Sequence, residues 1–207
     1  MTITPYYQDD HATIYHGDSL EIMPGLAYDV IVTDPPYGIN LNTRRSATLK
    51  NRVIGGKEIK SRSGRSHAPI VGDDTPFDPA PFLEWPCVFT GPNHFASRLP
   101  ETGRWHVWDK TGGGSLSTGL GAEFELIWTS FPSGRGIIYR VDWSGFERVN
   151  KHPESFQHPT TKPTALMRQL IEISPPGVIL DPFMGSGTTL RAAKDLGRHS
   201  IGIELEE

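Results

Sequence analysis

The fold is decided by residues 178–189, which read Val-Ile-Leu-Asp-Pro-Phe-Met-Gly-Ser-Gly-Thr-Thr. The apolar start predicts a buried strand, and the pattern from Thr188 to the helix-ending Gly197 predicts a helix. Between them, Gly185 and Gly187 let the backbone approach a ligand closely and expose N–H groups near a helix N-terminus. This stretch therefore predicts a strand, a ligand-binding loop and a helix of an α/β domain.

A second predicted strand, residues 199–204, follows this helix and ends in an acid. Glu204 lies roughly twenty residues after Asp181, the spacing at which a nucleotide-binding α/β unit places its ribose ligand. The loop is not a P-loop, because no Lys follows the second glycine. It also lacks the third glycine of the dinucleotide fingerprint.

A second informative motif, Asp34-Pro35-Pro36-Tyr37, follows the apolar run Val30–Thr33. The run predicts a buried strand, and the two prolines predict a stiff turn at its end. Such a turn presents a carboxylate, backbone carbonyls and an aromatic ring. A planar base with an exocyclic amine fits these groups, because the amine has two hydrogens to donate and the ring can stack on Tyr37.

The complete pattern predicts an α/β fold with a doubly wound, mostly parallel sheet. Strands are expected at 12–16, 28–33, 86–90, 103–109, 123–129, 177–181 and 199–204. Helices are expected near 18–24, 79–84, 93–98, 163–173 and 187–196. Ligands of such sheets bind at the carboxyl ends of the strands, where Asp34, Asp181 and Glu204 are all expected. One crevice is therefore predicted to hold two ligands.

Both motifs resemble those of the S-adenosylmethionine-dependent DNA amino-methyltransferases, which methylate adenine at N6 or cytosine at N4. The tetrapeptide at 34–37 resembles their catalytic motif, and residues 181–189 resemble their cofactor loop. The cofactor loop follows the catalytic motif, an order that resembles the circularly permuted beta class. The resemblance implies a Rossmann-like methyltransferase fold and S-adenosyl-L-methionine as the cofactor.

The resemblance also implies the site residues. The catalytic residues are Asp34, Pro35, Pro36 and Tyr37. Asp18, in His16-Gly17-Asp18-Ser19, matches the family's acid that faces the cofactor adenine, and 158–163 resemble the segment beside the methionine end of the cofactor. Trp108-Asp109-Lys110 also matches the family. The expected cofactor-binding residues are Asp18, Asp34, Lys162, Asp181, Phe183, Gly185, Ser186, Gly187, Thr188 and Glu204.

Composition indicates one catalytic domain over residues 1–207. The single cysteine, Cys87, excludes a disulfide framework and is expected in the core, and the scattered histidines predict no metal site. No signal pattern or membrane-length apolar run is found, so a cytoplasmic protein of a bacterial or phage-infected cell is expected, without membrane contact.

Net charge is −4, but the charge is unevenly distributed. Residues 38–71 hold eight Lys or Arg and one acid, and they predict a long basic loop inserted after the catalytic motif. A loop beside a catalytic motif is expected to be functional, and its cations would neutralise phosphates of double-stranded DNA. The expected DNA-binding residues are Arg44, Arg45, Arg62 and Arg65.

A second candidate DNA-contacting segment is 133–157, where basic and aromatic residues alternate. Its residues Ile137-Ile138-Tyr139 equally suit an edge strand, so two interpretations remain open.

The expected reaction is direct methyl transfer to the N6 amine of a flipped adenine. Cytosine-N4 methylation stays open, although the family's cytosine enzymes more often carry Ser where this chain has Asp34. Motif order argues against RNA or protein substrates. A catalytically impaired DNA- or cofactor-binding protein also stays open, because a further helix is expected after Glu204 and the chain stops at Glu207. A restriction endonuclease partner and the oligomeric state are left open.

Overall fold

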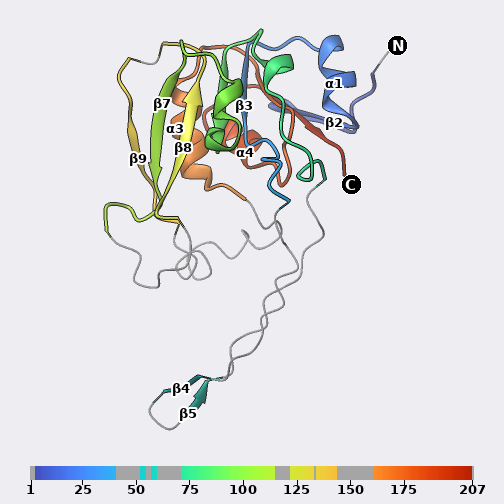
Figure 1. Cartoon of the computed structure of the whole chain (residues 1–207). Helices are drawn as coiled ribbons and strands as arrows, with labels where there is room; N and C mark the ends of the chain where they lie inside the picture. Colours follow the sequence, from blue (N-terminus) through green and yellow to red (C-terminus); the bar gives the residue numbers. More distant parts are fainter. Residues whose placement is uncertain are drawn as a thin grey trace.

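The computed structural model describes residues 3–40, 52–54, 57–59, 71–114, 122–132, 134–143 and 161–206. Within this part of the chain, nine strands form one sheet in the order β1-β2-β11-β10-β3-β6-β8-β7-β9 (Figure 1). A separate antiparallel pair is formed by β4 (Arg52–Ile54) and β5 (Lys57–Ile59).

Five neighbouring strands at the centre of the large sheet run parallel: β2 (Ala12–His16), β11 (Ser200–Glu204), β10 (Ile179–Asp181), β3 (Val30–Thr33) and β6 (Cys87–Thr90). Next to β6, β8 (Phe124–Thr129) runs antiparallel between β6 and β7 (Arg104–Asp109), and β9 (Ile138–Arg140) pairs parallel to β7. At the other edge, β1 (Tyr7–Gln8) is antiparallel to β2. The predicted mostly parallel α/β sheet is therefore confirmed, and residues 138–140 form the edge strand.

Two α-helices cover one face of this sheet: α3 (Thr164–Ile173) and α4 (Thr188–Asp195) (Figure 1). The other helical segments of the described residues are short: α1 (Ser19–Ile22) with η1 (Met23–Gly25), η2 (Ala80–Phe82), η3 (Pro92–His94) and η4 (Ala96–Arg98). The helix predicted near 79–84 is thus one 3₁₀ turn, η2, and the helix predicted near 93–98 is two, η3 and η4. Pro86 and Pro100 follow these two segments, and a proline disfavours helical backbone in the residue before it, as the extended Leu99 shows.

The strands separate two cores because side chains alternate across a sheet. Val30 and Val32 of β3 face the α3 and α4 side, where they pack with Leu170 and other helix residues. Ile31 faces the opposite side, where it joins Phe89 and a phenylalanine-rich cluster. A strand that buries both faces carries a continuous apolar run, which is why 30–33 could be recognised from the sequence.

Cys87 lies fully buried in β6, as expected for a core residue. Burial raises the pKa of its thiol to about 11, so the thiol stays protonated and unreactive near neutral pH. Of the helices in the described ranges, none has the length and apolar character needed to cross a bilayer.

Candidate active site

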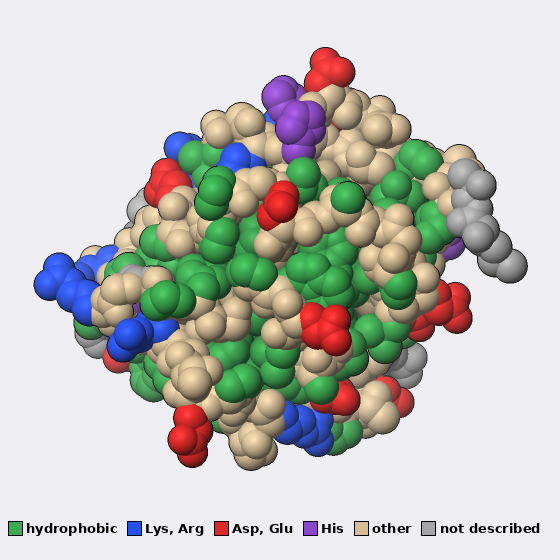
Figure 2. Space-filling view, turned by 90° about the horizontal axis from the view of Figure 1, so that it is seen from above, with side chains coloured by type: hydrophobic (Ala, Val, Ile, Leu, Met, Phe, Trp, Pro, Cys, Tyr) green, Lys and Arg blue, Asp and Glu red, His purple; other side chains and the backbone are tan. Residues whose placement is uncertain are grey.

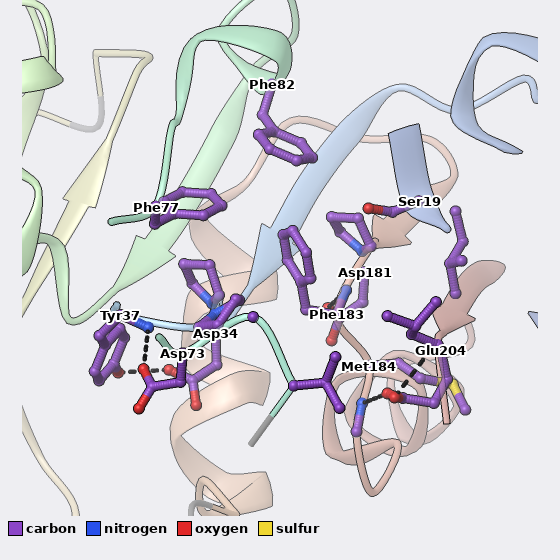
Figure 3. A pocket seen from close by; sticks show the side chains of 18 of the residues that line it. Ser19, Asp34, Tyr37, Asp73, Phe77, Phe82, Asp181, Phe183, Met184 and Glu204 are labelled. Carbon is purple, nitrogen blue, oxygen red and sulfur yellow. Dashed lines mark hydrogen bonds between the residues drawn. The ribbon is translucent and has the colours of Figure 1, made fainter. Parts of the chain in front are cut away.

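A cavity of about 840 Å³ opens at the carboxyl ends of the central parallel strands. Both sequence motifs line it, from Asp34 and Tyr37 at one end to Gly185 and Glu204 at the other (Figure 3). Its volume lies within the range of roughly 300–1,000 Å³ typical of small-molecule sites. The parallel strands therefore bring together the two motifs that the sequence placed at their ends.

The carboxylate of Asp34 lies directly after β3 and has three side-chain partners. Its Oδ1 accepts hydrogen bonds from the hydroxyls of Tyr37, at 2.6 Å, and Thr90, at 2.5 Å. Its Oδ2 accepts a hydrogen bond from the Lys162 ammonium at 2.7 Å. The motif thus presents an oriented carboxylate rather than a freely rotating one.

Lys162 also joins Asp34 to a second carboxylate, that of Glu125 on β8. Its Nζ lies 3.2 Å from Glu125 Oε1, and Lys110 Nζ lies 2.8 Å from Glu125 Oε2. Burial opposes the charges of both groups, but the ion pairs dominate: Lys162 and Lys110 lower the pKa of Glu125 to about 2, and Asp34, Tyr37 and Glu125 hold the pKa of Lys162 well above its usual value. The ion pairs therefore keep Glu125 ionised and Lys162 protonated near pH 7.

Tyr37 lies between these charges. Its hydroxyl is 3.0 Å from Lys162 Nζ and 3.0 Å from Glu125 Oε1, in addition to the shorter contact with Asp34. Its ring is stacked on His94, with centroids 4.8 Å apart and planes 17° apart. A side chain at position 91 would overlap this ring, so Gly91, at a φ of 63°, is required for Tyr37 to pack there.

Asp73 holds the backbone of the motif. Although it is only 4% exposed, its Oδ1 accepts hydrogen bonds from three successive backbone N–H groups, those of Tyr37, Gly38 and Ile39, at 2.9–3.3 Å. Its own carbonyl accepts a fourth from Asn40 at 2.6 Å. One buried anion thereby fixes the turn that carries Tyr37 (Figure 3).

Asp73→Asn is expected to lower kcat by roughly tenfold, equivalent to about 1.4 kcal/mol of transition-state stabilisation. The amide oxygen still accepts hydrogen bonds, but it loses the charge that strengthens them. Steady-state methylation assays would measure the change, with Asp74→Asn, an exposed neighbour, as the matched control. Equal activities of the two variants would show that the hydrogen bonds to Asp73 do not position the 34–37 motif for catalysis.

The glycine loop connects β10 to α4 at the other end of the cavity. Gly185 and Gly187 have φ values of 48° and 74°, a region that favours glycine. Gly187 is the N-cap of α4 and is not among the cavity-lining residues, whereas Gly185, Ser186 and Thr188 line the cavity. The second glycine therefore turns the chain into the helix, and the first faces the ligand space.

Glu204, at the end of β11, fastens the loop. Its Oε2 accepts a hydrogen bond from Gly185 N at 2.8 Å, and its Oε1 accepts from the backbone N–H groups of Leu205 and Glu206. The loop packs against Gly202, where a Cβ atom would lie 2.5 Å from the Met184 sulfur. The carboxylate expected to bind ribose therefore also holds the loop.

Asp181 is 2% exposed and accepts hydrogen bonds from the Thr33 hydroxyl at 2.6 Å and from Phe183 N at 3.2 Å. Burial raises its pKa to about 6. Phe183 packs edge-on against Phe77 and Phe82, which form an apolar wall of the cavity. Asp18 is exposed on the cavity rim, and its Oδ1 caps α1 by accepting from Leu20 N.

The structure thus brings together every site residue expected in the described part of the chain, with Gly187 set back from the cavity surface. Lys162, expected beside the cofactor, directs its ammonium to Asp34. Arg44, Arg45, Arg62 and Arg65 lie outside the described residues, as do 133 and 144–157 of the second candidate DNA segment. Within that segment, Arg140 is exposed on β9, with Asp109 3.8 Å away.

Sequence inspection missed Asp73, Thr90, His94 and Glu125 as site residues. Each lies far along the chain from Asp34, and none belongs to a local motif. Lys110, the second ion-pair partner of Glu125, did have a sequence signal, because it belongs to the Trp108-Asp109-Lys110 motif that resembles the family.

Comparison of this chain with known proteins finds similarity to DNA methyltransferases. A family model described as "DNA methylase", for N6 and N4 methyltransferases, matches residues 93–207, more than half of the chain. The chain is 28% identical to the type II methyltransferase M.ScaI of Streptomyces caespitosus, covering 98% of this chain and 80% of that protein. A shorter region, 31% of this chain and 18% of the relative, is 46% identical to the type II methyltransferase M.HinfI of Haemophilus influenzae.

Two solved structures share the fold. The M1.HpyAVI–SAM complex has a TM-score of 0.50 and 23% identity, covering 94% of this chain and 93% of the other. The PvuII DNA methyltransferase, described as cytosine-N4-specific, has a TM-score of 0.51 and 14% identity, covering 99% and 85%. Because the family model matches more than half of the sequence, including the glycine loop and Glu204, this chain belongs to the N6/N4 DNA methylase family, the S-adenosylmethionine-dependent amino-methyltransferases of DNA.

Proposed function

We propose that this protein methylates the N6 amine of adenine in double-stranded DNA. The observation that carries the proposal is the Asp34 carboxylate at the cavity wall, oriented by Thr90 and Lys162. An ionised carboxylate accepts hydrogen bonds only, so it suits an exocyclic amine and disfavours a carbonyl oxygen. Asp34 favours adenine over cytosine, since cytosine-N4 enzymes of the family more often carry Ser at this position.

The cavity fits S-adenosylmethionine at its glycine-loop end. Gly185 leaves backbone space without a side chain, Phe183 and Phe77 supply apolar surface, and Glu204 and Asp18 supply carboxylates. We expect Glu204 to accept hydrogen bonds from the ribose hydroxyls of the cofactor and Asp18 to face the adenine ring of the cofactor. When bound, this cofactor supplies an electrophilic methyl group on a positively charged sulfur.

The protein's own contribution is positioning. Asp34 and the backbone carbonyl of Pro35 would accept the two hydrogens of the target amine, which turns its lone pair away from conjugation with the ring. Tyr37 supplies an aromatic face for the base. Asp73 fixes the turn that carries Tyr37 by accepting hydrogen bonds from the backbone N–H groups of Tyr37 and Gly38. Held geometry of this kind can lower a barrier by several kcal/mol. Asp34 need not be a strong base, since the amine hydrogens become acidic as the nitrogen is methylated.

Product analysis tests the proposal. Unmethylated genomic DNA would be incubated with the protein and isotopically labelled S-adenosylmethionine, digested to nucleosides and analysed by mass spectrometry. We expect labelled N6-methyldeoxyadenosine. Labelled N4-methyldeoxycytidine would contradict the adenine assignment, and the absence of any labelled nucleoside would indicate a protein without methyltransferase activity.

DNA contact is proposed for the basic residues of the 38–71 segment. Outside this segment the chain carries twelve Lys or Arg and twenty-three acids. On the face shown in Figure 2, the acidic and basic side chains of the described residues are scattered and do not gather into one basic patch. Attraction to phosphates is therefore assigned to the segment that follows Tyr37.

Replacing Arg44, Arg45, Arg62 and Arg65 together with glutamine is expected to weaken DNA binding at low salt. The slope of log affinity against log salt concentration should become shallower by about 0.9 for each phosphate that the variant no longer neutralises. Fluorescence anisotropy across a salt series would measure the slope, and cofactor affinity serves as the control because it should not change. An unchanged slope would contradict DNA contact by these four arginines and would favour the segment around Arg140 as the DNA-binding surface.

A further inference from the structure

The Tyr37 hydroxyl lies 3.0 Å from Glu125 Oε1 and makes two further contacts in the base-binding end of the cavity. It donates to Asp34 Oδ1 at 2.6 Å, and it accepts from Lys162 Nζ at 3.0 Å. A single oxygen thus satisfies a fixed acceptor and a fixed donor that lie side by side. All three residues line the cavity, so another ligand can reach the same two groups.

The amine-bearing edge of adenine offers a matching pair. Its N6 amine is a donor, and its N1 ring nitrogen, separated from the amine nitrogen by one carbon, is an acceptor. An enzyme that extrudes a base commonly reads this Watson–Crick edge by hydrogen bonds. The order of donor and acceptor is reversed on guanine and thymine, whose carbonyl would face Asp34 and whose N–H would face Lys162.

We propose that the Tyr37 hydroxyl occupies the place of this edge in the base-free protein, and that Lys162 donates a hydrogen bond to the ring nitrogen beside the methylated amine. This inference rests on the proposed amino-methyltransferase function and names a specificity residue for it. Departure of the hydroxyl frees a lone pair on Asp34 and a hydrogen on Lys162 at the same moment. The entering base replaces both contacts, while the ring of Tyr37 remains available for stacking.

The remaining contacts explain why Lys162 stays in place during this exchange. Its ammonium keeps Asp34 Oδ2 at 2.7 Å and Glu125 Oε1 at 3.2 Å. Glu125 is held by Lys110 from its other oxygen, and Asp34 by the Thr90 hydroxyl. The network thus stays electrically balanced, and the donor is already oriented when the base arrives. Because Lys162 is 9% exposed, little water competes for its free hydrogen.

Base analogues test this directly. Once sequencing of the methylated DNA has located the target sequence, duplexes would carry adenine, 1-deazaadenine or 3-deazaadenine at the target position. 1-Deazaadenine keeps the amine but lacks the ring acceptor beside it, and 3-deazaadenine keeps that acceptor. For the wild-type protein we expect kcat/KM to fall roughly 10- to 100-fold with 1-deazaadenine, the usual effect of removing a hydrogen bond from a charged group, and to change much less with 3-deazaadenine.

The Lys162→Met variant completes the cycle, because methionine has a similar length and no donor. It should already be slow on adenine, and 1-deazaadenine should cause no additional decrease. A structural role for Lys162 would instead leave the analogue penalty unchanged in the variant, and that result would overturn the inference. If Lys162→Met fails to fold, the wild-type series still decides, since equal rates on adenine and 1-deazaadenine exclude a donor to this nitrogen.

Tyr37→Phe provides an independent measurement, because it removes the hydroxyl and keeps the ring. If the hydroxyl competes with the base, this variant should bind the target duplex several-fold more tightly than the wild-type protein. Weaker binding would contradict the competition. Should unmodified DNA yield N4-methylcytosine, the adenine proposal is wrong, while 3-deazacytosine, which lacks the ring nitrogen beside the amine, tests Lys162 in the same way.

Discussion

Asp34→Ala is expected to lower the methylation rate by at least 100-fold, because it removes the carboxylate that we propose orients the target amine. Removing one oriented hydrogen-bonding group from an active site typically costs about 10²–10³ in kcat. Single-turnover assays with labelled S-adenosylmethionine would measure the rate. Cofactor affinity, measured by calorimetry, should be nearly unchanged, since Asp34 lies at the base end of the cavity (Figure 3).

The structure also shows why this variant needs a matched control. Asp34→Ala removes one of the two anions that balance Lys162 and leaves the buried ammonium with Glu125 and Tyr37. A buried cation with fewer partners destabilises the fold. The double variant Asp34→Ala/Lys162→Met removes both charges, so it should be more stable than the single variant and equally inactive. Near-normal turnover in either variant would show that the carboxylate does not act on the amine.

Glu204→Ala is expected to weaken S-adenosylmethionine binding by about 1.5–3 kcal/mol, the usual contribution of hydrogen bonds to a charged group. Two effects combine, because the carboxylate is both the proposed ribose acceptor and the partner of Gly185 N in the glycine loop. Isothermal titration calorimetry would measure the affinity. Glu101→Ala, at an exposed position outside the cavity, is the control for the change of charge.

Glu204→Gln separates the two roles. Its single amide oxygen can still accept from Gly185 N, while the NH2 group that replaces the second oxygen cannot accept a hydrogen bond from the ribose. We therefore expect an affinity between those of the wild-type and alanine proteins, with thermal stability close to that of the wild type. Unchanged cofactor binding in Glu204→Ala would remove this residue from the cofactor site.

The positions of the strands could be predicted closely because each has a local cause. The apolar runs at 30–33, 87–90 and 179–181 are buried on both faces, so their sequences are continuous rather than alternating. The helix after the glycine loop likewise begins and ends near the residues that local signals indicated. The two predicted helices that are 3₁₀ segments are each followed by a proline, Pro86 or Pro100, which disfavours helical backbone in the residue before it.

The sequence by itself determined the α/β fold, the proline-rich turn at 34–37, the glycine loop and the acid at Glu204. These features depend on neighbouring residues and on the rule that parallel strands present their carboxyl ends at one edge. The environment of Asp34 was decided only by the tertiary structure. Lys162 lies 128 residues from Asp34 in the chain, and Thr90 lies 56 residues away. Sheet order places β3, β6 and β8 side by side, and only that packing brings Thr90, Glu125 and the Asp34 carboxylate into one network. Charges that far apart in sequence have no local pattern, because their energy of interaction depends on the distance between them in space.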